Sequence, residues 1–268
     1  MVVRRSEHYL NNELSISTTG VYTRAHLYRH PKTGREVKLI GMLHTAEPDY
    51  YTQVKNELLA CDVVLYEYIE DNSGNDQVAD DGQEIRNSHK EDFLMAIIQS
   101  YFAALDTRPI DFLMGEGAAF SSMRQRENWF CADFFHEDSE RAHELQRRVS
   151  DTMLRRIRRI SEDRAFKAAF FLGDAIVNIK KEIFTKRDFA RTIKIIFDRD
   201  LLGNIIDRDA IKQRDTFCFD RFDEVIKTHA PKLVGIKYGV AHMHNQKRLL
   251  KKRGYEHISS KKLFCVRF

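Results

Sequence analysis

The sequence predicts an α/β fold, with a central mixed or mostly parallel sheet flanked by helices and a helical insertion or lid. Short β-branched runs alternate with amphipathic patterns along much of the chain, which is typical of parallel strands joined by helices. Residues 137–200 are almost all helix-compatible, with Gly173 as the only glycine. We therefore expect one α/β domain over residues 1–268, in which this stretch forms the helical layer or lid.

The first half of the chain contains the clearest strand signals. Residues 25–30 and 36–40 flank the turn sequence Pro31 to Gly34, so a hairpin is expected. A helix should begin near Pro48, because the N–H of the first helical residue has no acceptor within the helix and its absence in proline costs nothing. The run 62–67 then reads as a buried strand that ends in a carboxylate. Strand, helix and strand in this order predict a parallel crossover unit.

The remaining elements follow from the same patterns. Residues 93–105 carry apolar side chains at helical spacing, and a second helix is expected from about 204 to 228. Residues 231–238 predict a strand, and a Lys- and Arg-rich helix should end at Gly254. The closing run 263–268 predicts a last strand.

Composition narrows the class of protein. The net charge is +4, from 44 basic and 40 acidic residues, so nucleic acid is not expected as a partner. Four widely spaced cysteines argue against disulfides and a structural zinc site. No apolar run is long enough to span a membrane or to form a secretion signal, so we expect a cytoplasmic protein. The oligomeric state stays open.

Two copies of the tetrapeptide Gly-x-x-His stand far apart in the chain, at Gly41 to His44 and at Gly239 to His242. Each copy follows a β-branched run and precedes a helical pattern. Such strand ends gather ligands and reacting groups in α/β proteins, and a glycine lets backbone or substrate come close. We predict that the two histidines share one site. The alternative is that each is a hydrogen-bonded structural residue.

Glu67 ends the neighbouring predicted strand and should face the same edge of the sheet as His44. Imidazole transfers protons near neutral pH, and its neutral form binds metals such as Zn, Mn or Co. Two histidines and a carboxylate form a common catalytic metal set. We predict that His44, Glu67 and His242 bind a divalent ion. A metal-free site stays open, because the chain has no His-Glu-x-x-His motif.

Other candidates carry weaker signals. Arg208 could hold an anionic transition state, although an ion pair on a helix surface explains the Asp-Arg-Asp run equally well. Asp133 ends an apolar run and could point into the cleft. Tyr50 and Tyr51 follow His44 and fit either pocket lining or packing. The remaining histidine near the second motif, at position 244, should point away from the site.

Several blocks of the sequence are similar to a known family. They are Leu39 to His44, Val63 to Glu67, Arg208-Asp209, Val234 to His242 followed by Gly254-Tyr255, and, more loosely, Trp129 to Asp133. On these residues the chain resembles the TraB/TIKI family, within a wider group that includes ChaN-like proteins and erythromycin esterases. Met42 departs from the small hydroxyl residue usual in relatives, and the chain shows no membrane segment.

The resemblance implies an α/β core with both Gly-x-x-His segments and the glutamate in one cleft. TIKI-like members are described as metal-dependent proteases. Erythromycin esterases are hydrolases without an agreed need for metal, and ChaN-like members bind haem. Fold alone does not choose among these functions.

We therefore expect a hydrolase, metal-dependent and peptidase-like, that acts on a peptide or a small molecule. The ion bound by the two histidines and Glu67 would polarise a carbonyl and activate water. Arg208 would steady the oxyanion, and Asp133 would orient a histidine. One alternative is a metal-independent esterase with His44 as general base, oriented by Glu67. The other is a haem-binding module with His44 or His242 as axial ligand.

Overall fold

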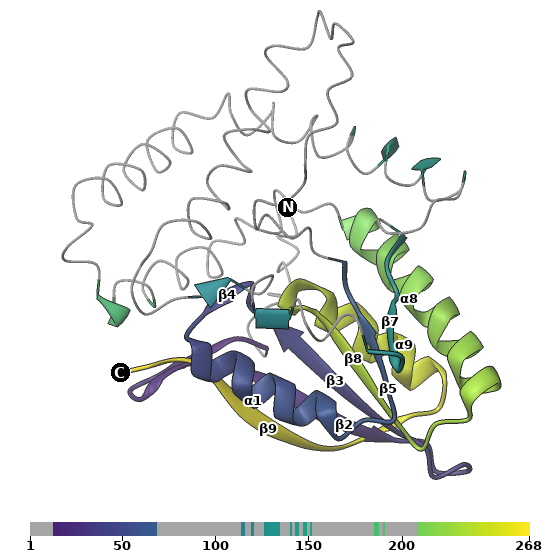
Figure 1. Ribbon diagram of the computed structural model, residues 1–268, viewed down its shortest axis with the longest axis horizontal. Helices are drawn as coiled ribbons and strands as arrows, with labels where there is room; N and C mark the ends of the chain where they lie inside the picture. Colours follow the sequence, from purple (N-terminus) through teal and green to yellow (C-terminus); the bar gives the residue numbers. More distant parts are fainter. Residues whose placement is uncertain are drawn as a thin grey trace, which may run out of the picture.

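The computed structural model describes the sheet and the helices that pack on it (Figure 1). The described residues are 13–68, 114–115, 119–120, 126–134 and 208–268, with short pieces at 140, 143–144, 147–148, 151, 185–187 and 190. The elements are β1 (Ser15–Ser17), β2 (Gly20–Arg29), β3 (Glu36–Met42), β4 (Thr45–Ala46), α1 (Pro48–Leu59), β5 (Val63–Tyr66), β6 (Met114–Gly115), β7 (Trp129–Cys131), α8 (Arg208–His229), β8 (Leu233–Gly239), the 3-10 turn η2 (Val240–His242), α9 (Met243–Lys252) and β9 (Glu256–Arg267). The helix predicted at 93–105 and most of the segment 137–200 lie outside the described residues.

Within the described residues, the strands form a seven-stranded mixed sheet, which confirms the predicted α/β class. The strand order is β1-β2-β3-β8-β5-β7, with β9 also paired to β2. The four strands β3, β8, β5 and β7 run parallel to one another. The pairs that β2 makes with β1, β3 and β9 are antiparallel. One side of the sheet is thus parallel and the other antiparallel.

The crossover unit predicted from the sequence is present as β3, α1 and β5, but its two strands are not neighbours. The strand β8, which comes much later in the chain, lies between them and pairs with both in parallel register. Asp62 helps to fix the start of β8, because its Oδ2 accepts the backbone N–H groups of Lys232 at 2.8 Å and Leu233 at 2.9 Å. A C-terminal segment therefore forms the centre of the parallel half.

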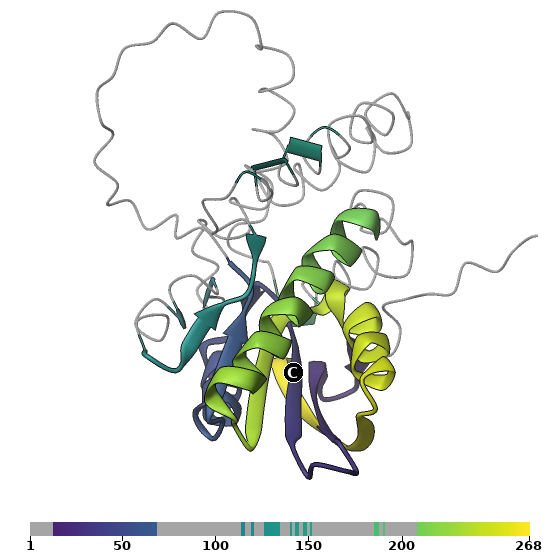
Figure 2. The same cartoon turned by 90° about the vertical axis from the view of Figure 1, so that its right-hand side faces the viewer.

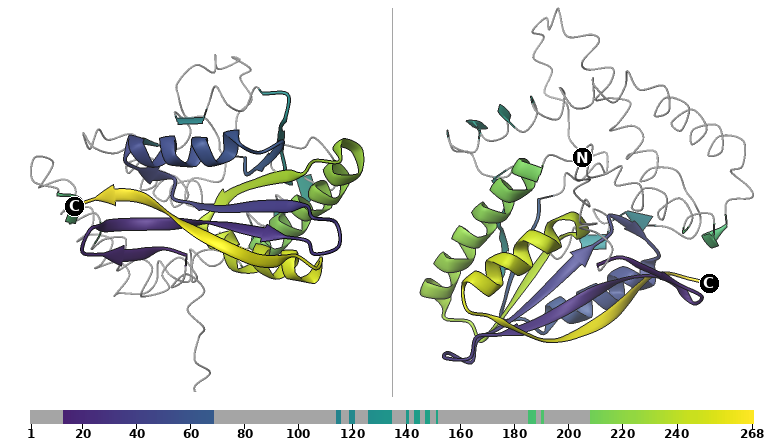
Figure 3. Two further views of the ribbon diagram at one scale, coloured as in Figure 1. Left: turned by 90° about the horizontal axis from the view of Figure 1, so that it is seen from below. Right: turned by 180° about the vertical axis from the view of Figure 1, so that it is seen from behind.

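Helices cover both faces of the sheet. The helix α1 lies on one face, and α8 and α9 lie on the other (Figure 3, left); Figure 2 shows α8 and α9 side by side. The side chains of β3 follow the strand period of two. Ile40 and Met42 join the core on the α1 face, while Val37 and Leu39 join the core under α8 and α9. Alternate side chains of the single strand β3 thus belong to two hydrophobic cores, one on each face of the sheet.

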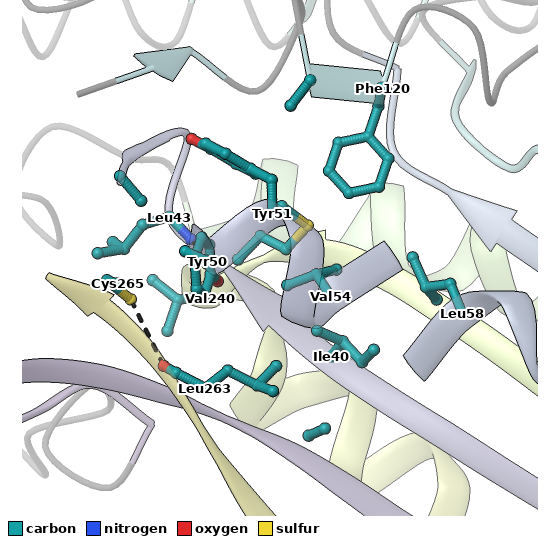
Figure 4. Close-up of a cluster of buried hydrophobic side chains, with 14 of the residues drawn as sticks. Ile40, Leu43, Tyr50, Tyr51, Val54, Leu58, Phe120, Val240, Leu263 and Cys265 are labelled. Carbon is teal, nitrogen blue, oxygen red and sulfur yellow. Dashed lines mark hydrogen bonds between the residues drawn. The ribbon is translucent and has the colours of Figure 1, made fainter. Parts of the chain in front are cut away.

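The core on the α1 face explains why the chain becomes helical after the first Gly-x-x-His segment. Pro48 occupies the first turn of α1, where its missing N–H costs nothing. Tyr51, Val54 and Leu58 then recur at helical spacing, and all are buried. Figure 4 shows these side chains gathered over Ile40 of β3. The predicted helix start is confirmed.

Two exclusions made from composition can be compared with the structure. All four cysteines lie within the described residues, and none of them forms a disulfide. In the part of the chain that the structure describes, no helix combines the length and the hydropathy that a membrane crossing requires.

Candidate functional site

Four neighbouring parallel strands end at one edge of the sheet, and each is followed by a candidate residue (Figure 1). His44 follows β3, and His242 closes the turn after β8. Glu67 directly follows β5, and Asp133 lies two residues beyond β7. Because these strands are adjacent and parallel, their carboxyl ends bring the four residues to the same edge.

Glu67 is the centre of this arrangement. Its side chain is buried, at 5% exposure for the residue. The backbone N–H of Gly239 donates to Glu67 Oε2 at 2.6 Å, and Arg214 contacts Glu67 Oε1 at 2.6 Å. Burial alone would raise the pKa of Glu67, but the positive charges of Arg214 and His242 hold it well below its ordinary value. Glu67 is therefore an ionised carboxylate inside the protein.

Arg214, on the buried side of α8, joins two of the strand ends. Its guanidinium forms an ion pair with Asp133 as well as with Glu67, and its Nε donates to Asp133 Oδ1 at 3.3 Å. Burial opposes the charge of Arg214, but the two carboxylates raise its pKa above the ordinary value. The planar guanidinium therefore bridges β5 and β7 as a fixed positive charge.

His242 is held between two carboxyl groups. Its Nδ1 lies 2.8 Å from Asp215 Oδ1, and its Nε2 lies 3.5 Å from Glu67 Oε1. Asp215 is itself held by Asn245 and Gln246, whose side-chain amides donate to it at 2.7 and 2.9 Å. Burial would lower the pKa of His242, but Glu67 and Asp215 raise it to about 9. His242 is therefore protonated at neutral pH.

His44 differs from His242 in being exposed. Its ring nevertheless lies against the second Gly-x-x-His segment. A Cβ placed on Gly239 would be 3.0 Å from His44 Nε2 and 3.2 Å from Glu67 Oε2. The absence of a side chain at Gly239 is what lets the imidazole and the carboxylate approach the same point. The sequence-based expectation that glycine permits close approach is met at this position.

The tyrosines after His44 hold its loop in place. The hydroxyl of Tyr51 donates to the backbone carbonyl of His44 at 2.9 Å. The hydroxyl of Tyr50 accepts the N–H of Leu43 at 3.3 Å and donates to the carbonyl of Gly41 at 3.4 Å. Both residues are buried, and Figure 4 shows Tyr50 and Tyr51 close to Leu43. Of the two interpretations left open by the sequence, packing describes these residues.

The arginine of the site is not the one selected from the sequence. Arg208 is exposed at the first residue of α8, whereas Arg214 contacts Glu67 and Asp133. The sequence did contain a signal for Arg214. It lies four residues from both Ala210 and Cys218, which are buried, so it stands on the apolar stripe of the helix. A charge on such a stripe needs a buried partner.

The arrangement of donor atoms differs from the predicted metal set. Both oxygens of Glu67 already accept a short contact, one from a cation, and the two ring nitrogens of His242 face Asp215 and Glu67. Among the described residues, no group of three His, Cys, Asp or Glu side chains is placed to hold a metal ion. As arranged, the side chains of His44, Glu67 and His242 do not fit a divalent ion, because Arg214 supplies the cation that Glu67 binds.

Comparison with known proteins gives no identification. No protein-family model matches the chain, and no curated protein matches it. The similarity to the TraB/TIKI family therefore stays a prediction.

Proposed function

We propose that the protein is a metal-independent hydrolase for a carbonyl substrate, an ester or amide of a peptide or small molecule. The observation that supports this most is the position of the Glu67 carboxylate. It lies against an exposed imidazole, His44, and also beside two fixed positive charges, Arg214 and His242. A general base and an anion-stabilising pair thus meet at one edge of the sheet.

His44 is the general base in this proposal. Its Nε2 and Glu67 Oε2 both lie close to the position that a Cβ of Gly239 would occupy, and the charge of His44 acts on Glu67, so the carboxylate can orient the ring and stabilise the imidazolium once it forms. Proton transfer then uses Nδ1, on the other side of the ring. His44 takes a proton from water while the water oxygen bonds to the carbonyl carbon. The tetrahedral intermediate breaks the bond to the leaving group, which departs with the proton from His44.

The two buried cations stabilise the oxygen that becomes negative. Arg214 and protonated His242 both flank Glu67 and act through their charge, and neither needs to reorganise during the reaction because Asp133 and Asp215 hold them in place. In comparable sites, the removal of one such oxyanion-stabilising group raises the activation barrier by about 3 to 4 kcal/mol. Asp133 and Asp215 act through these cations and are positioning residues.

The predicted metal-dependent version requires a different arrangement of the same residues. A divalent ion at Glu67 would have to displace the Arg214 guanidinium, and His242 would have to turn a ring nitrogen away from Asp215 or Glu67. Haem ligation by His242 meets the same obstacle, because Asp215 and Glu67 face its two nitrogens. These observations favour the metal-free alternative.

Hydrolysis of p-nitrophenyl acetate by the full chain tests the proposal. We expect turnover above buffer that survives 1,10-phenanthroline and EDTA. In a Ser260→Ala background, in which the exposed serine of β9 cannot contribute, turnover should fall roughly 10²- to 10⁴-fold in His44→Gln, since this is the range for loss of a general base. His244→Gln is the matched control, because His244 is exposed on α9 and should leave the rate unchanged. Turnover abolished by chelation and restored by Mn, Co or Zn would support the metal-dependent version instead.

The proposal agrees with the resemblance to TraB/TIKI-like hydrolases on one specific point. That resemblance requires both Gly-x-x-His segments and the glutamate at one place, and His44, Glu67 and Gly239 meet within 3.0 to 3.2 Å of a single point. We further propose a peptide or small-molecule substrate, and a location in the cytoplasm, which we expect from the lack of a long apolar run in the sequence.

A further inference from the structure

A second carboxylate–imidazole arrangement lies on the antiparallel half of the sheet, away from the strand ends that carry His44 and Glu67. His26 on β2 stands directly opposite Ser260 on β9. His26 Nδ1 lies 2.7 Å from Ser260 Oγ, and His26 Nε2 lies 2.8 Å from Glu13 Oε2. Serine, histidine and glutamate are therefore connected in series, with the histidine in the middle. This is the connectivity of an activated nucleophile, recognised by geometry and not by sequence position.

The three side chains differ in burial as a nucleophilic site requires, with the carboxylate and the imidazole buried and the serine exposed. Glu13 and His26 are each only 4% exposed, while Ser260 is exposed on β9. A buried base therefore lies beneath a hydroxyl that solvent can reach. The side chain of Lys247, from α9, also forms an ion pair with Glu13, so the carboxylate is anchored from two sides.

The charge of Glu13 fixes the useful tautomer of His26. Burial alone would raise the pKa of Glu13, but hydrogen bonds from His26 and Lys247 lower it below its ordinary value. An ionised carboxylate only accepts hydrogen bonds, so His26 Nε2 carries the proton that faces Glu13. In the neutral ring, Nδ1 is then the acceptor for the Ser260 hydroxyl. The two nitrogens have exchanged roles relative to the usual serine hydrolase, but either can act as the base.

A β-bulge adds a fourth group. The register of β2 with β9 shifts between Leu27 and Tyr28, so that Tyr28 pairs with His257 and Leu27 with Ser259. The extra residue puts His257 and Ser260, three positions apart, on the same face of the strand. His257 Nε2 lies 2.8 Å from Ser260 Oγ. A second imidazole thus lies beside the nucleophilic oxygen and can help to orient the Ser260 hydroxyl.

We propose that Ser260 is a second nucleophile of this protein, activated by His26 and Glu13, for the acyl groups of small esters that reach the exposed strand β9. Ser260 Oγ bonds to the carbonyl carbon while its proton moves to His26 Nδ1. The bond to the alcohol breaks, and the alcohol leaves with that proton. Water then cleaves the acyl-serine by the same proton transfers and regenerates the hydroxyl. This site needs no residue of the proposed hydrolase site.

A biotinylated fluorophosphonate is the probe, because its reaction stops at the covalent stage. Oγ forms a bond to phosphorus, the phosphorus–fluorine bond breaks, fluoride leaves and the proton passes to His26. On the full chain we expect one adduct, located at Ser260 by peptide mass mapping. Ser260→Ala should abolish it, and both His26→Gln and Glu13→Gln should slow labelling, the former roughly 100-fold, as for loss of a general base.

Matched controls separate this site from the chain's other features. Ser259→Ala is the first control, because Ser259 is equally exposed and adjacent but pairs with Leu27; it should leave labelling unchanged. His44→Gln is the second and should also leave labelling unchanged, so failure of one site is visible independently of the other. Absence of an adduct on the folded wild-type chain would overturn the proposal. So would an adduct that persists in Ser260→Ala, or equal labelling rates in wild type and Glu13→Gln.

Discussion

The two Gly-x-x-His segments have the same local sequence pattern and opposite environments. The first leaves its histidine exposed, in a loop held by Tyr51. The second buries its histidine at 4% exposure, between Asp215 and Glu67. One imidazole can therefore exchange protons with water, while the other is a fixed cation. Identical spacing presents a histidine at a strand end, but the neighbouring elements decide its protonation.

The difference arises from the elements that come after each strand. After β3 the chain turns into the short strand β4 and then α1, on the α1 face of the sheet. After β8 it continues through η2 directly into α9, which packs beside α8. Asp215 of α8 therefore contacts His242. The contacts described for His44 do not include Asp215. A glutamate from a third strand, Glu67, then serves both histidines.

The largest effect is expected from the residue that both segments share. Glu67→Gln removes the carboxylate that balances Arg214 and His242, and leaving buried charges uncompensated costs about 3 to 5 kcal/mol. The free energy of unfolding in urea should fall by that amount, and the ester hydrolysis that remains in a Ser260→Ala background should be lost with it. Glu36→Gln is the control, since the pair of Glu36 with Arg29 is more exposed and its loss should cost about 1 kcal/mol or less.

Exchange of each histidine for glutamine sharpens the comparison between the segments. His242→Gln should lower the free energy of unfolding by about 3 kcal/mol, because two carboxyl groups lose their buried partner, and it should also lower the rate. His44→Gln should lower the rate alone, with the melting temperature close to that of wild type. Equal loss of stability in the two variants would contradict the description of His242 as a buried partner of two carboxyl groups and of His44 as an exposed side chain.

The pH dependence of stability is the third test. The pKa of His242 rises from 6.5 in the unfolded chain to about 9 in the folded protein. Its contribution is therefore complete below pH 6.5 and is lost as the pH rises through 9. By linkage this amounts to about 3 kcal/mol. Urea unfolding between pH 6 and pH 10 measures it as the difference between wild type and His242→Gln, which should lack this part of the pH dependence but keep that of the buried cysteines.

The smallest effects are expected at the glycines that begin the two segments. A Cβ on Gly239 would come within 3.0 Å of His44 Nε2, so Gly239→Ala should displace the imidazole and lower kcat roughly tenfold. A Cβ on Gly41 would lie 2.6 Å from Cγ of Met243. That side chain is flexible and is not part of the ion pairs around Glu67, so Gly41→Ala should cost about 1 kcal/mol of stability and leave kcat unchanged. A larger kcat effect at Gly41 would contradict this assignment.

The parts of the fold that could be predicted are those encoded locally. The hairpin before His44, the helix start at Pro48 and the strand before Glu67 follow from turn residues and periodicity, and the structure contains all of them. The insertion of β8 between β3 and β5 could not be predicted, because parallel runs of β-branched residues do not specify their neighbours. The sequence therefore indicated which strand ends carry functional residues but not their order.

Among the site residues, too, those with a local sequence signal could be predicted and those that depend on long-range packing could not. His44, Glu67, Asp133 and His242 were found because each closes or follows an apolar run. Arg214 was missed because helix α8 contains two Arg-Asp pairs, and only the apolar residues four positions away on either side, Ala210 and Cys218, distinguish the second pair from the first. Ser260 gave no local signal at all. Its partners arise from long-range pairing of β2 with β9 and from a bulge in that pairing.

The central place of β8 has a consequence for how the protein is made. A ribosome releases β3 and β5 long before β8, so the two strands emerge without the partner that hydrogen-bonds both. Pairings between segments so distant in the chain form slowly, since loop closure must precede them. Nascent chains that stop short of Leu233 can form neither the parallel pairs that β8 makes with β3 and β5 nor the contact between Gly239 and Glu67. The two Gly-x-x-His segments are thus brought together late in synthesis, when β8 is inserted between its two partner strands.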